Sequence, residues 1–572
     1  FITLFFDVAF GAFQEPVLDE AGNPTFSQEP VMLELDAPLE AAMMDADGNV
    51  PTDDEGQSVL IEFPAGARIH QVDADGNAMF TDGDAVTEGA KLPFLVVWLA
   101  IGAIFFTVYH GFINLRGFKH AIDIVRGKWA APDDTGDISP FRALTSALSA
   151  TVGLGNIAGV AIAMVIGGPG ALFWMMVLGF FGMASKFHET TLSQMFRIQN
   201  KDGSMSGGPM FFLSQGLKQT YPNAPGIAAF GKVLAVVFAI FLMGASLGGG
   251  NMFQANQSYE AFFDQFVQPV LADETLGNPE ALAEAKGYVS VGFGILMASI
   301  VAVVVIGGIG RIGAATSVIV PVMALIYVAA CLFIILSNAS MLPDLIGEVF
   351  QKAWAPEAGL GGVLGAMMVG FQRAAFSSEA GIGSSAVAHS AAKTDEPVRE
   401  GLVASLEPFV DTIVICFMTG MVVLITGAYL GEVEGGAAVT LAAFASNETL
   451  ETLLFPKILT ISIVLFAFST MIAWCYYGER AWGYLFGIHT VIVFRLAFVV
   501  CVFLGSVMSL GAAIDSADAM LLSCALPNIL GGILLAPLVK KRLTHYWSKY
   551  RSGELKPGEP VAPIPGDAGA DI

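Results

Sequence analysis

The residues best suited to chemistry in this chain lie where an apolar run is interrupted. The stretch from Ile138 to Gly170 is largely apolar, but Gly153-Leu154-Gly155-Asn156 breaks it near its middle. A glycine inside a helix costs roughly 1 kcal/mol relative to alanine, so the helix is weakest there. Inside a bilayer, the backbone groups that a break frees must be satisfied by protein, water or a ligand. The break is therefore the first candidate for a binding site.

This interruption offers groups suited to two kinds of ligand. Backbone carbonyls can coordinate a small hard cation, and amides can hold a carboxylate; the groups are the carbonyls near Ser149, Thr151 and Val152, the amides of Leu154 and Gly155, and the side-chain oxygen of Asn156. An oxygen-only shell suits an alkali cation, whereas nitrogen and sulfur ligands would indicate a transition metal. Sodium is the simplest expectation. The alternative is that the glycines only allow close helix packing.

A second broken segment runs from Gly365 to Thr394, with Gly381-Ile382-Gly383-Ser384 at the break. Phe376 and Trp474 can cap a small apolar side chain, or they can simply pack against neighbouring helices. A small cavity would select alanine or glycine. Paired interruptions in two corresponding segments indicate a binding site near the membrane midplane of a secondary transporter.

Three further polar residues lie within apolar runs. Gln254 belongs to the run Gly250-Asn251-Met252-Phe253-Gln254, where amides at membrane depth are costly unless they have partners, so it either binds substrate or bridges helices. Ser469 and Thr470 can complete a cation shell begun by Ser149 and Val152. Alternatively, their hydroxyls bond to carbonyls of the preceding helical turn.

The composition indicates a polytopic membrane protein. Of the 572 residues 55% are hydrophobic and only 14% charged, which is too apolar for a soluble chain. The net charge of −24 excludes a nucleic-acid partner on ordinary grounds, because phosphate binding needs a clustered basic surface. The sequence shows no nucleotide-binding context and no serine, histidine and acid arrangement, so we expect no enzyme activity and no cofactor beyond a coupling ion.

Eleven crossings account for the apolar segments, at about 92–110, 138–167, 171–187, 226–262, 287–306, 314–337, 365–394, 398–427, 455–487, 489–510 and 518–539. The first is followed by a basic stretch with Arg116, Lys119, Arg126 and Lys128. The positive-inside rule places that stretch in the cytoplasm. The N-terminus is then outside and the C-terminus inside.

Removing the first span leaves ten, and each broken segment begins a group of five. The expected parts are an extra span with a cytoplasmic linker at 91–129, a first five-helix repeat at 138–337, an extracellular connection at 338–358 and a second repeat at 360–543. Five is odd, so the two groups have opposite topology. This organisation predicts an inverted-repeat transporter with its site between the repeats.

The ends of the chain differ from this core. Residues 1–13 are apolar but too short to span, which favours an interfacial or re-entrant helix. Residues 14–90 hold eighteen Asp or Glu and one Arg, and turn signals between short alternating runs predict a water-facing, hairpin-rich insertion of open role and unknown partner. Two Asp-Ala-Asp-Gly-Asn turns lack the rest of a calcium loop and are interpreted as plain turns. Residues 552–572 should be a disordered cytoplasmic tail.

Several long motifs, in order, resemble the alanine or glycine:cation symporter family. They are TVGLGNIAGVAIAMVIGGPGALFWMMVLGFFGMASKFHE, SGGPMFF, GNMFQAN, FSSEAGIGSSAVAHSAAKT, EPFVDTIVICFMTG and CYYGERA. The resemblance runs from about Leu92 to Arg542. It is far more specific than a single glycine pattern.

The resemblance implies an all-α, leucine-transporter-type core of ten helices with one preceding span, in a bacterial or archaeal plasma membrane. It also implies Na⁺-coupled import of alanine or glycine by alternating access. Its implied sodium ligands are the carbonyls of Ser149 and Val152 with Ser469 and Thr470. Its implied substrate-site residues are Thr151 and Asn156, near substrate or a second ion, and Leu154, Gly155, Gln254 and Trp474, lining the pocket.

Two features depart from the family pattern. Residue 154 is Leu where the family frequently has Thr, so one hydroxyl contact is missing and the identity of the substrate stays open. The acidic insertion has no counterpart in the family. Two other functions therefore remain: a transporter of another small zwitterion with the same fold, and a membrane amino-acid sensor that uses the insertion to bind a partner.

Overall fold

The structure is a computed structural model that describes residues 94–201, 203–275, 279–355, 362–431, 436–446, 455–508 and 519–558, and six short strands between residues 26 and 85. The chain divides into two compact units, one of Ala12–Lys91 and one of Phe1–Gly11 with Leu92–Ile572. The helix expected over 1–13, both Asp-Ala-Asp-Gly-Asn turns and residues 559–572 of the expected tail lie outside the described residues.

The smaller unit contains three nested antiparallel strand pairs. The pairs are β1 (Phe26–Pro30) with β6 (Phe80–Ala85), β2 (Met32–Glu34) with β5 (Arg68–His70), and β3 (Leu39–Ala42) with β4 (Leu60–Phe63). The outermost strands in sequence thus pair with each other, and each inner pair lies within the next. The apolar run at 59–63, which alternates as a strand should, contains β4.

The larger unit is helical. Its first half contains α2 (Phe94–Tyr109), α3 (Ile113–Arg116), α4 (Phe118–Val125), α5 (Pro140–Thr151), η1 (Gly155–Gly159), α6 (Val160–Met195), the hairpin β7 (Ile198–Gln199) and β8 (Met205–Ser206), α7 (Pro209–Phe211), η2 (Phe212–Gly216), α8 (Leu217–Thr220), α9 (Pro225–Leu247), η3 (Gly248–Met252), α10 (Phe253–Phe262), η4 (Phe263–Val267), α11 (Gln268–Thr275), α12 (Pro279–Val305) and α13 (Gly308–Ser337).

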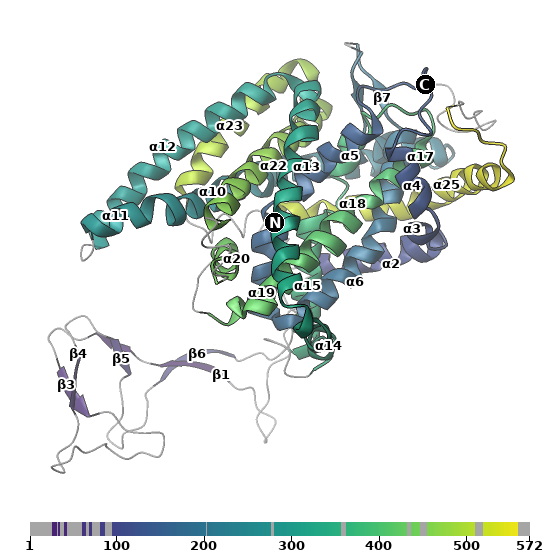
Figure 1. The fold of residues 1–572 in the computed structure, drawn as a ribbon. Helices are drawn as coiled ribbons and strands as arrows, with labels where there is room; N and C mark the ends of the chain where they lie inside the picture. The colour runs from purple at the N-terminus through teal and green to yellow at the C-terminus, as the bar shows by residue number, and fades with distance from the viewer. Residues whose placement is uncertain are drawn as a thin grey trace. The chain divides into compact units, whose positions relative to one another are not determined.

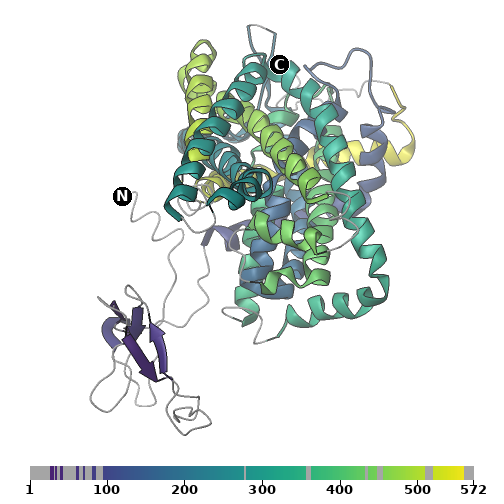
Figure 2. The same ribbon diagram turned by 60° about the vertical axis from the view of Figure 1, so that its left-hand side comes forward.

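The second half contains η5 (Ala339–Met341), α14 (Leu342–Lys352), α15 (Gly362–Ser378), α16 (Ser385–His389), α17 (Pro397–Ala404), α18 (Leu406–Pro408), η6 (Phe409–Cys416), α19 (Phe417–Thr426), η7 (Ala428–Leu430), α20 (Gly436–Ala445), α22 (Phe455–Phe486), η8 (Ile488–Thr490), α23 (Val491–Val507) and α25 (Ala525–Ser552). Figure 2 shows α14 turning away from the direction of α13.

Eight helices among the described residues are long and apolar enough to cross a membrane. They cover Gly155–Met195, Pro225–Leu271, Glu284–Val305, Gly308–Ser337, Pro397–Thr426, Phe455–Phe486, Ile488–Val507 and Ala519–Ser552. The first of these is kinked at Gly168, where the expected spans at 138–167 and 171–187 meet without a loop. Helix α2 and the two half-helices α5 and α15 are shorter. The chain is therefore an all-α, multi-pass membrane protein outside its β-strands.

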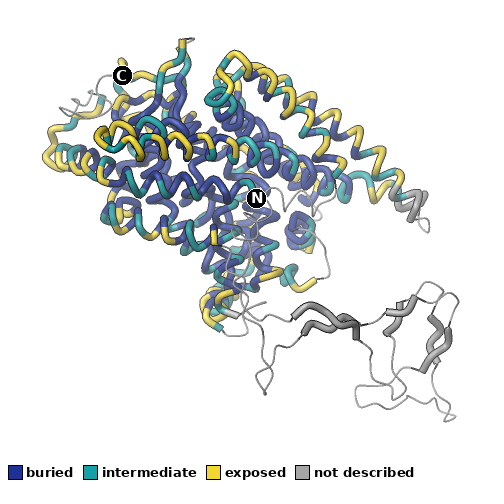
Figure 3. Tube along the Cα trace, turned by 180° about the vertical axis from the view of Figure 1, so that it is seen from behind, coloured by how far each residue is buried: buried dark blue, intermediate teal, exposed yellow. Residues whose placement is uncertain are grey.

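The helices form a buried centre with a lipid-facing rim. Helix α6 packs against α15, α17 and α2, while α22 packs against α9, α5 and α10. Helices α12 and α23 lie side by side (Figure 1). Buried residues dominate the centre and exposed ones follow the outer helices (Figure 3). Exposed side chains on α12 include Ile295, Leu296 and Val303. Such a surface would be an aggregation liability in water but suits contact with acyl chains.

The first broken segment has a clear start and a clear end. Ser139 caps α5, its hydroxyl accepting from the backbone N–H of Arg142 at 3.3 Å, and Pro140 occupies the first helical position, where its missing N–H costs nothing. The helix ends at Thr151, because Val152 is extended with φ −76° and ψ 93°. The chain resumes as a π-helix at Gly155, so the expected interruption at 153–156 is confirmed.

The second broken segment is interrupted by left-handed residues. Helix α15 ends at Ser378, and Glu379 follows with φ +54°, which is uncommon for a residue with a side chain. Gly381 and Gly383 have φ of +84° and +88°, which glycine adopts without steric cost. Helix α16 then begins at Ser385. The sequence prediction of a break at 381–384 is confirmed.

One guanidinium joins the chain entering α5 to the chain leaving α16. The chain entering α5 pairs with the chain leaving α16, where Ile138 N–H donates to Ala391 and Lys393 N–H donates to Ile138. Arg197, at the end of α6, donates to four backbone carbonyls at 2.7–3.1 Å, those of Thr135, Ser390, Ala392 and Thr394. The side chain of Arg197 is 8% exposed, so these bonds are made largely out of water.

Candidate substrate and cation site

The two breaks lie against each other in the middle of the helical unit. A Cβ atom on Gly155 would lie 3.2 Å from the Cα atom of Ser377 and 3.4 Å from the ring of Phe376. A residue with a side chain would push the two segments apart at this point. Glycine at 155 therefore allows the close approach that brings both sets of freed backbone groups to one place.

A small cavity lies beside this contact. Its volume is about 10 Å³, and it is lined by Ala150, Thr151, Gly153, Gly155, Gly249, Gln254, Phe376, Glu379, Trp474 and Leu521. About one water molecule fits a space of that size. An amino acid can enter only after the lining side chains or the helices around them move.

Helices α5 and α22 exchange two hydrogen bonds next to the cavity. The Ser149 hydroxyl donates to the backbone carbonyl of Ser469 at 2.7 Å, and the Thr470 hydroxyl donates to the backbone carbonyl of Ser149 at 3.0 Å. All three residues are fully or almost fully buried, as is Val152 one turn along. The structure thus brings together Ser149, Ser469 and Thr470, three of the four residues that sequence analysis assigned to sodium.

This oxygen cluster adjoins the cavity. A Cβ atom on Gly153 would lie 2.6 Å from the hydroxyl oxygen of Thr470 and 3.7 Å from the amide oxygen of Gln254. Little more than the backbone of Gly153 therefore lies between the oxygen cluster and the cavity. Thr151 lines the cavity, and its hydroxyl donates back to the carbonyl of Ala147 at 3.3 Å.

Gln254 presents an acceptor beside the cavity. Its Nε2 group donates to the carbonyl of Gly249 at 3.0 Å, but its buried Oε1 atom has no hydrogen-bond partner among the described residues. An unsatisfied buried acceptor costs free energy, about 1–3 kcal/mol. A substrate ammonium group is one donor that would satisfy it.

Two aromatic side chains close the cavity. Trp474 is 3% exposed, and a Cβ atom on Gly250 would lie 2.2 Å from its Cγ atom, so the indole rests directly on the η3 backbone. Phe376 meets Phe253 edge to face, with ring centroids 5.5 Å apart. Both residues that sequence analysis proposed as caps therefore line the cavity, and both also pack against neighbouring helices.

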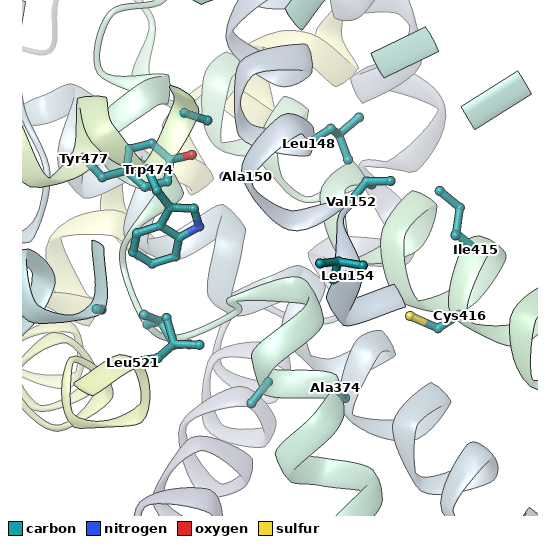
Figure 4. Close-up of a cluster of buried hydrophobic side chains, with 14 of the residues drawn as sticks. Leu148, Ala150, Val152, Leu154, Ala374, Ile415, Cys416, Trp474, Tyr477 and Leu521 are labelled. Carbon is teal, nitrogen blue, oxygen red and sulfur yellow. The ribbon is translucent and has the colours of Figure 1, made fainter. Parts of the chain in front are cut away.

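Leu154 and Asn156, which sequence analysis also assigned to the substrate site, direct their side chains away from the cavity. In Figure 4, Leu154 lies on the side of Val152 and Cys416, away from Trp474. Asn156 turns its amide away from the cavity: Oδ1 accepts from Gly153 N–H at 2.8 Å. Neither side chain is part of the cavity lining, and Leu154 is fully buried.

The carboxylate of Asp411 is the principal polar group that sequence analysis did not assign. It accepts from Asn156 Nδ2 at 2.5 Å, from the Ser377 hydroxyl at 2.8 Å and from the Thr412 hydroxyl at 2.8 Å. Asp411 is fully buried in the π-helix η6. An acidic residue inside the apolar run Phe409–Cys416 was a visible signal, because ionisable groups at membrane depth are rare and usually functional.

Glu379 was also missed as a lining residue. The structure places it at the cavity in a left-handed conformation, with its carboxylate hydrogen-bonded to the hydroxyl of Ser384. The second break thus contributes a carboxyl group to the cavity wall and holds it with its own backbone turn.

A buried ionic network positions α16 behind the cavity. Lys186 Nζ lies 3.1 Å from Glu407 Oε2 and 2.6 Å from the hydroxyl of Ser385. The His389 ring contacts Glu400 through Nδ1 and Glu407 through Nε2, each at 2.6 Å. A neutral imidazole has one N–H, so two contacts this short require one more proton within these three groups. The network ties α16 to α6, α17 and α18.

Comparison with known proteins identifies the family. The model of the sodium:alanine symporter family matches residues 79–559. The sodium/alanine symporter AgcS of Methanococcus maripaludis is 39% identical over 81% of this chain and 96% of that protein. An uncharacterized transporter of Haemophilus influenzae is 38% identical over 80% of this chain and 94% of that protein.

Among solved structures, the crystal structure of MhsT in complex with L-phenylalanine aligns at 16% identity and a TM-score of 0.46, covering 76% of this chain and 95% of that one. The family match spans most of the helical unit, including both breaks and the cluster between α5 and α22. The chain therefore belongs to the sodium:alanine symporter family, and it is a sodium-coupled amino-acid symporter and not an enzyme.

Proposed function

We propose that the protein imports alanine or glycine together with Na⁺, and that the coupling cation binds at Ser149, Val152, Ser469 and Thr470. The observation that carries the proposal is the pair of hydrogen bonds between Ser149 and α22, which lies next to the cavity. Two buried hydroxyls and two backbone carbonyls meet there, and an alkali cation prefers an oxygen shell of this kind.

The substrate would lie in the cavity between the breaks. Its carboxylate would face the amides of Leu154 and Gly155 at the start of η1, where the helix N-terminus favours an anion. Its ammonium group would face the Oε1 atom of Gln254. Phe376 and Trp474 leave room only for a small side chain, which favours alanine and glycine over larger zwitterions.

Coupling follows from the position of Gly153 between the two ligands. A cation bound to the carbonyls of Ser149 and Val152 fixes the end of α5, and the same segment presents the amides that hold the carboxylate. Binding one ligand therefore orders part of the site of the other. This is positive coupling through a shared segment, and by linkage each ligand raises the affinity of the other by the same factor.

The transport cycle would be alternating access. The cavity of about 10 Å³ is too small for an amino acid, so binding and release would require movement of the helices around it. The helix order supports two five-helix groups of opposite topology, 138–337 and 360–543, that share the site. By the positive-inside rule, the basic residues after α2 favour a cytoplasmic position for 110–129, so the N-terminus, the insertion and the connection at 338–358 would lie outside a bacterial inner membrane.

Uptake into proteoliposomes tests this function. Labelled alanine should accumulate under an inward Na⁺ gradient, should not accumulate when K⁺ replaces Na⁺, and should be displaced by excess glycine. Binding of alanine without accumulation would contradict transport and would favour an amino-acid sensor. Accumulation of another small zwitterion in preference to both amino acids would contradict the substrate assignment only.

A further inference from the structure

A second cavity, whose lining shares no residue with the substrate site, includes Ile198 of β7 in its wall. Figure 1 shows β7 at one end of the helical unit. Its volume is about 570 Å³. It is enclosed by the hairpin β7–β8, by α7, by the last turns of α22 and by the first turns of α23; the polar residues in its wall are Asn200, Ser206, Glu479, Arg480, His489 and Arg495. The proposed orientation places this end in the cytoplasm.

The charges in this wall leave one guanidinium in excess. Arg495 is paired, with its Nε atom 2.6 Å from Glu479 Oε2. Arg480 forms no ion pair with a described residue: NH1 donates to the Ser206 hydroxyl at 3.0 Å, its Nε is buried without a partner, and its guanidinium lies over the Tyr476 ring. The cavity therefore has a net positive wall, and the ring and the hydroxyl hold Arg480 in place.

A preorganised arginine facing a polar cavity is suited to a phosphate group. The planar guanidinium binds phosphate oxygens with two parallel N–H donors, and a fixed side chain loses little conformational entropy on binding. His489 is exposed at the edge of the same cavity and supplies a further polar contact. Anionic headgroups are bound in basic pockets of this kind between helices on the cytoplasmic side.

The surroundings of the cavity favour an amphiphile over a free anion. Ile492 lines the cavity and is also 48% exposed on the surface of α23. From there a stripe of exposed apolar side chains continues along the helix at successive turns, through Val493, Leu496, Val500 and Leu504. An acyl chain can lie along this stripe while its headgroup lies in the polar cavity.

We propose that the cavity between β7–β8, α22 and α23 binds the phosphate headgroup of an anionic phospholipid of the inner leaflet, with Arg480 as its main ligand. One acyl chain of this lipid packs against the apolar stripe on α23. The hairpin in its wall also contacts the chain that leads into α5, because Met205 N–H donates to Asp137, three residues before the helix, at 2.9 Å. A bound lipid therefore braces the segment that leads into the substrate site.

Thermal unfolding of the full chain in nanodiscs tests the proposal. Replacing phosphatidylcholine by phosphatidylglycerol should raise the Tm, and Arg480→Gln should increase the phosphatidylglycerol fraction needed for half of that effect at least tenfold. Arg551→Gln, which removes an exposed arginine in the last turn of α25, should behave as the wild type. An Arg480→Gln variant that responds like Arg551→Gln would overturn the proposal.

Two further measurements separate the remaining outcomes. If millimolar inorganic phosphate raises the Tm in phosphatidylcholine and abolishes the effect of phosphatidylglycerol, the ligand is free phosphate and the lipid assignment is wrong. If Arg480→Gln fails to fold, a photoreactive phosphatidylglycerol is used with the wild type. Labels within 479–496 would support the proposal, and labels confined to other helices would refute it.

Discussion

Asn156 Nδ2 donates to Asp411 Oδ1 across 2.5 Å, so that the first broken segment is bonded to a helix that follows it by more than two hundred residues. The same carboxylate accepts from Ser377 of the second broken segment. Asp411 is thus the point where both breaks are held together. The contact is fully buried, which makes it costly to leave either partner alone.

Replacing Asn156 by alanine removes a donor from a buried carboxylate. We expect Asn156→Ala to lower the free energy of unfolding by about 2 kcal/mol and to reduce alanine uptake, since the two breaks lose their common anchor. The control is Asn338→Ala, whose amide caps the end of α13 at 2.9 Å. A double-mutant cycle with Asp411→Ala measures the coupling; additive effects would show that the bond does not act as an anchor.

The oxygen cluster predicts a specific kinetic effect. Thr470→Ala removes a hydroxyl from the proposed cation shell, so the Na⁺ concentration for half-maximal uptake should rise about tenfold, equivalent to about 1.4 kcal/mol. Ser462→Ala removes another buried hydroxyl from α22 that bonds only to its own helix. Its Na⁺ dependence should match the wild type. Equal Na⁺ dependence in both variants would place the cation elsewhere.

Gly250 should tolerate no side chain. A Cβ atom there would overlap Trp474 at 2.2 Å, so Gly250→Ala must displace the indole that closes the cavity. Overpacking of a buried site costs about 1–3 kcal/mol, and here it also alters the substrate pocket. Gly292→Ala meets nothing within 4 Å and serves as the matched control. We expect alanine uptake to fall only in the first variant.

His120 predicts a pH dependence of stability outside the membrane spans. Burial, reinforced by the nearby charge of Arg399, lowers the pKa of His120 to about 4. In the unfolded chain this imidazole is protonated below about pH 6.5, whereas in the folded chain it is protonated only below about pH 4. The free energy of unfolding therefore decreases as the pH falls from 6.5 to 4. The Tm of His120→Gln should depend less on pH between 4.5 and 7 than that of the wild type; identical slopes would exclude His120 as the cause.

The acidic insertion should be dispensable for transport. The family match begins at residue 79, so nearly all of 14–90 lies before it. We expect a chain lacking residues 16–86 to retain Na⁺-driven alanine uptake with unchanged affinity for both ligands. Size-exclusion chromatography would establish that the variant is folded. Loss of uptake in a folded variant would make the insertion part of the mechanism.

Sequence analysis was strongest where local backbone chemistry decides the structure. Glycines at 153, 155, 381 and 383 weaken a helix whatever surrounds them, so both breaks could be located from the sequence. The meeting of Ser149 with Ser469 and Thr470 depends on how α5 and α22 pack, and it was expected only as one of two alternatives. Hydroxyls in apolar helices usually bond to their own helix, and Ser469 does so as well.

The direction of side chains could not be read in the same way. The family resemblance implied a place for Asn156 near substrate or a second ion, and its amide points to Asp411 and not to the cavity. The same resemblance implied that Leu154 lines the pocket, and its side chain is buried on the other side. Asn156 lies in a π-helix that begins at Gly155, whose altered spacing rotates its side chains relative to those of an α-helix. Sequence periodicity contains no sign of that rotation.

Arg197 has a mechanical consequence for any cycle that opens this protein. One guanidinium donates hydrogen bonds to carbonyls on the chain entering α5 and on the chain leaving α16, so these ends of α5 and α16 are held together. Neither end can swing outward alone without breaking charge-assisted bonds in a site shielded from water, where they are strongest. In the alternating-access cycle that we propose, the ends of α5 and α16 that Arg197 joins would therefore move together, and the two breaks would act as paired hinges.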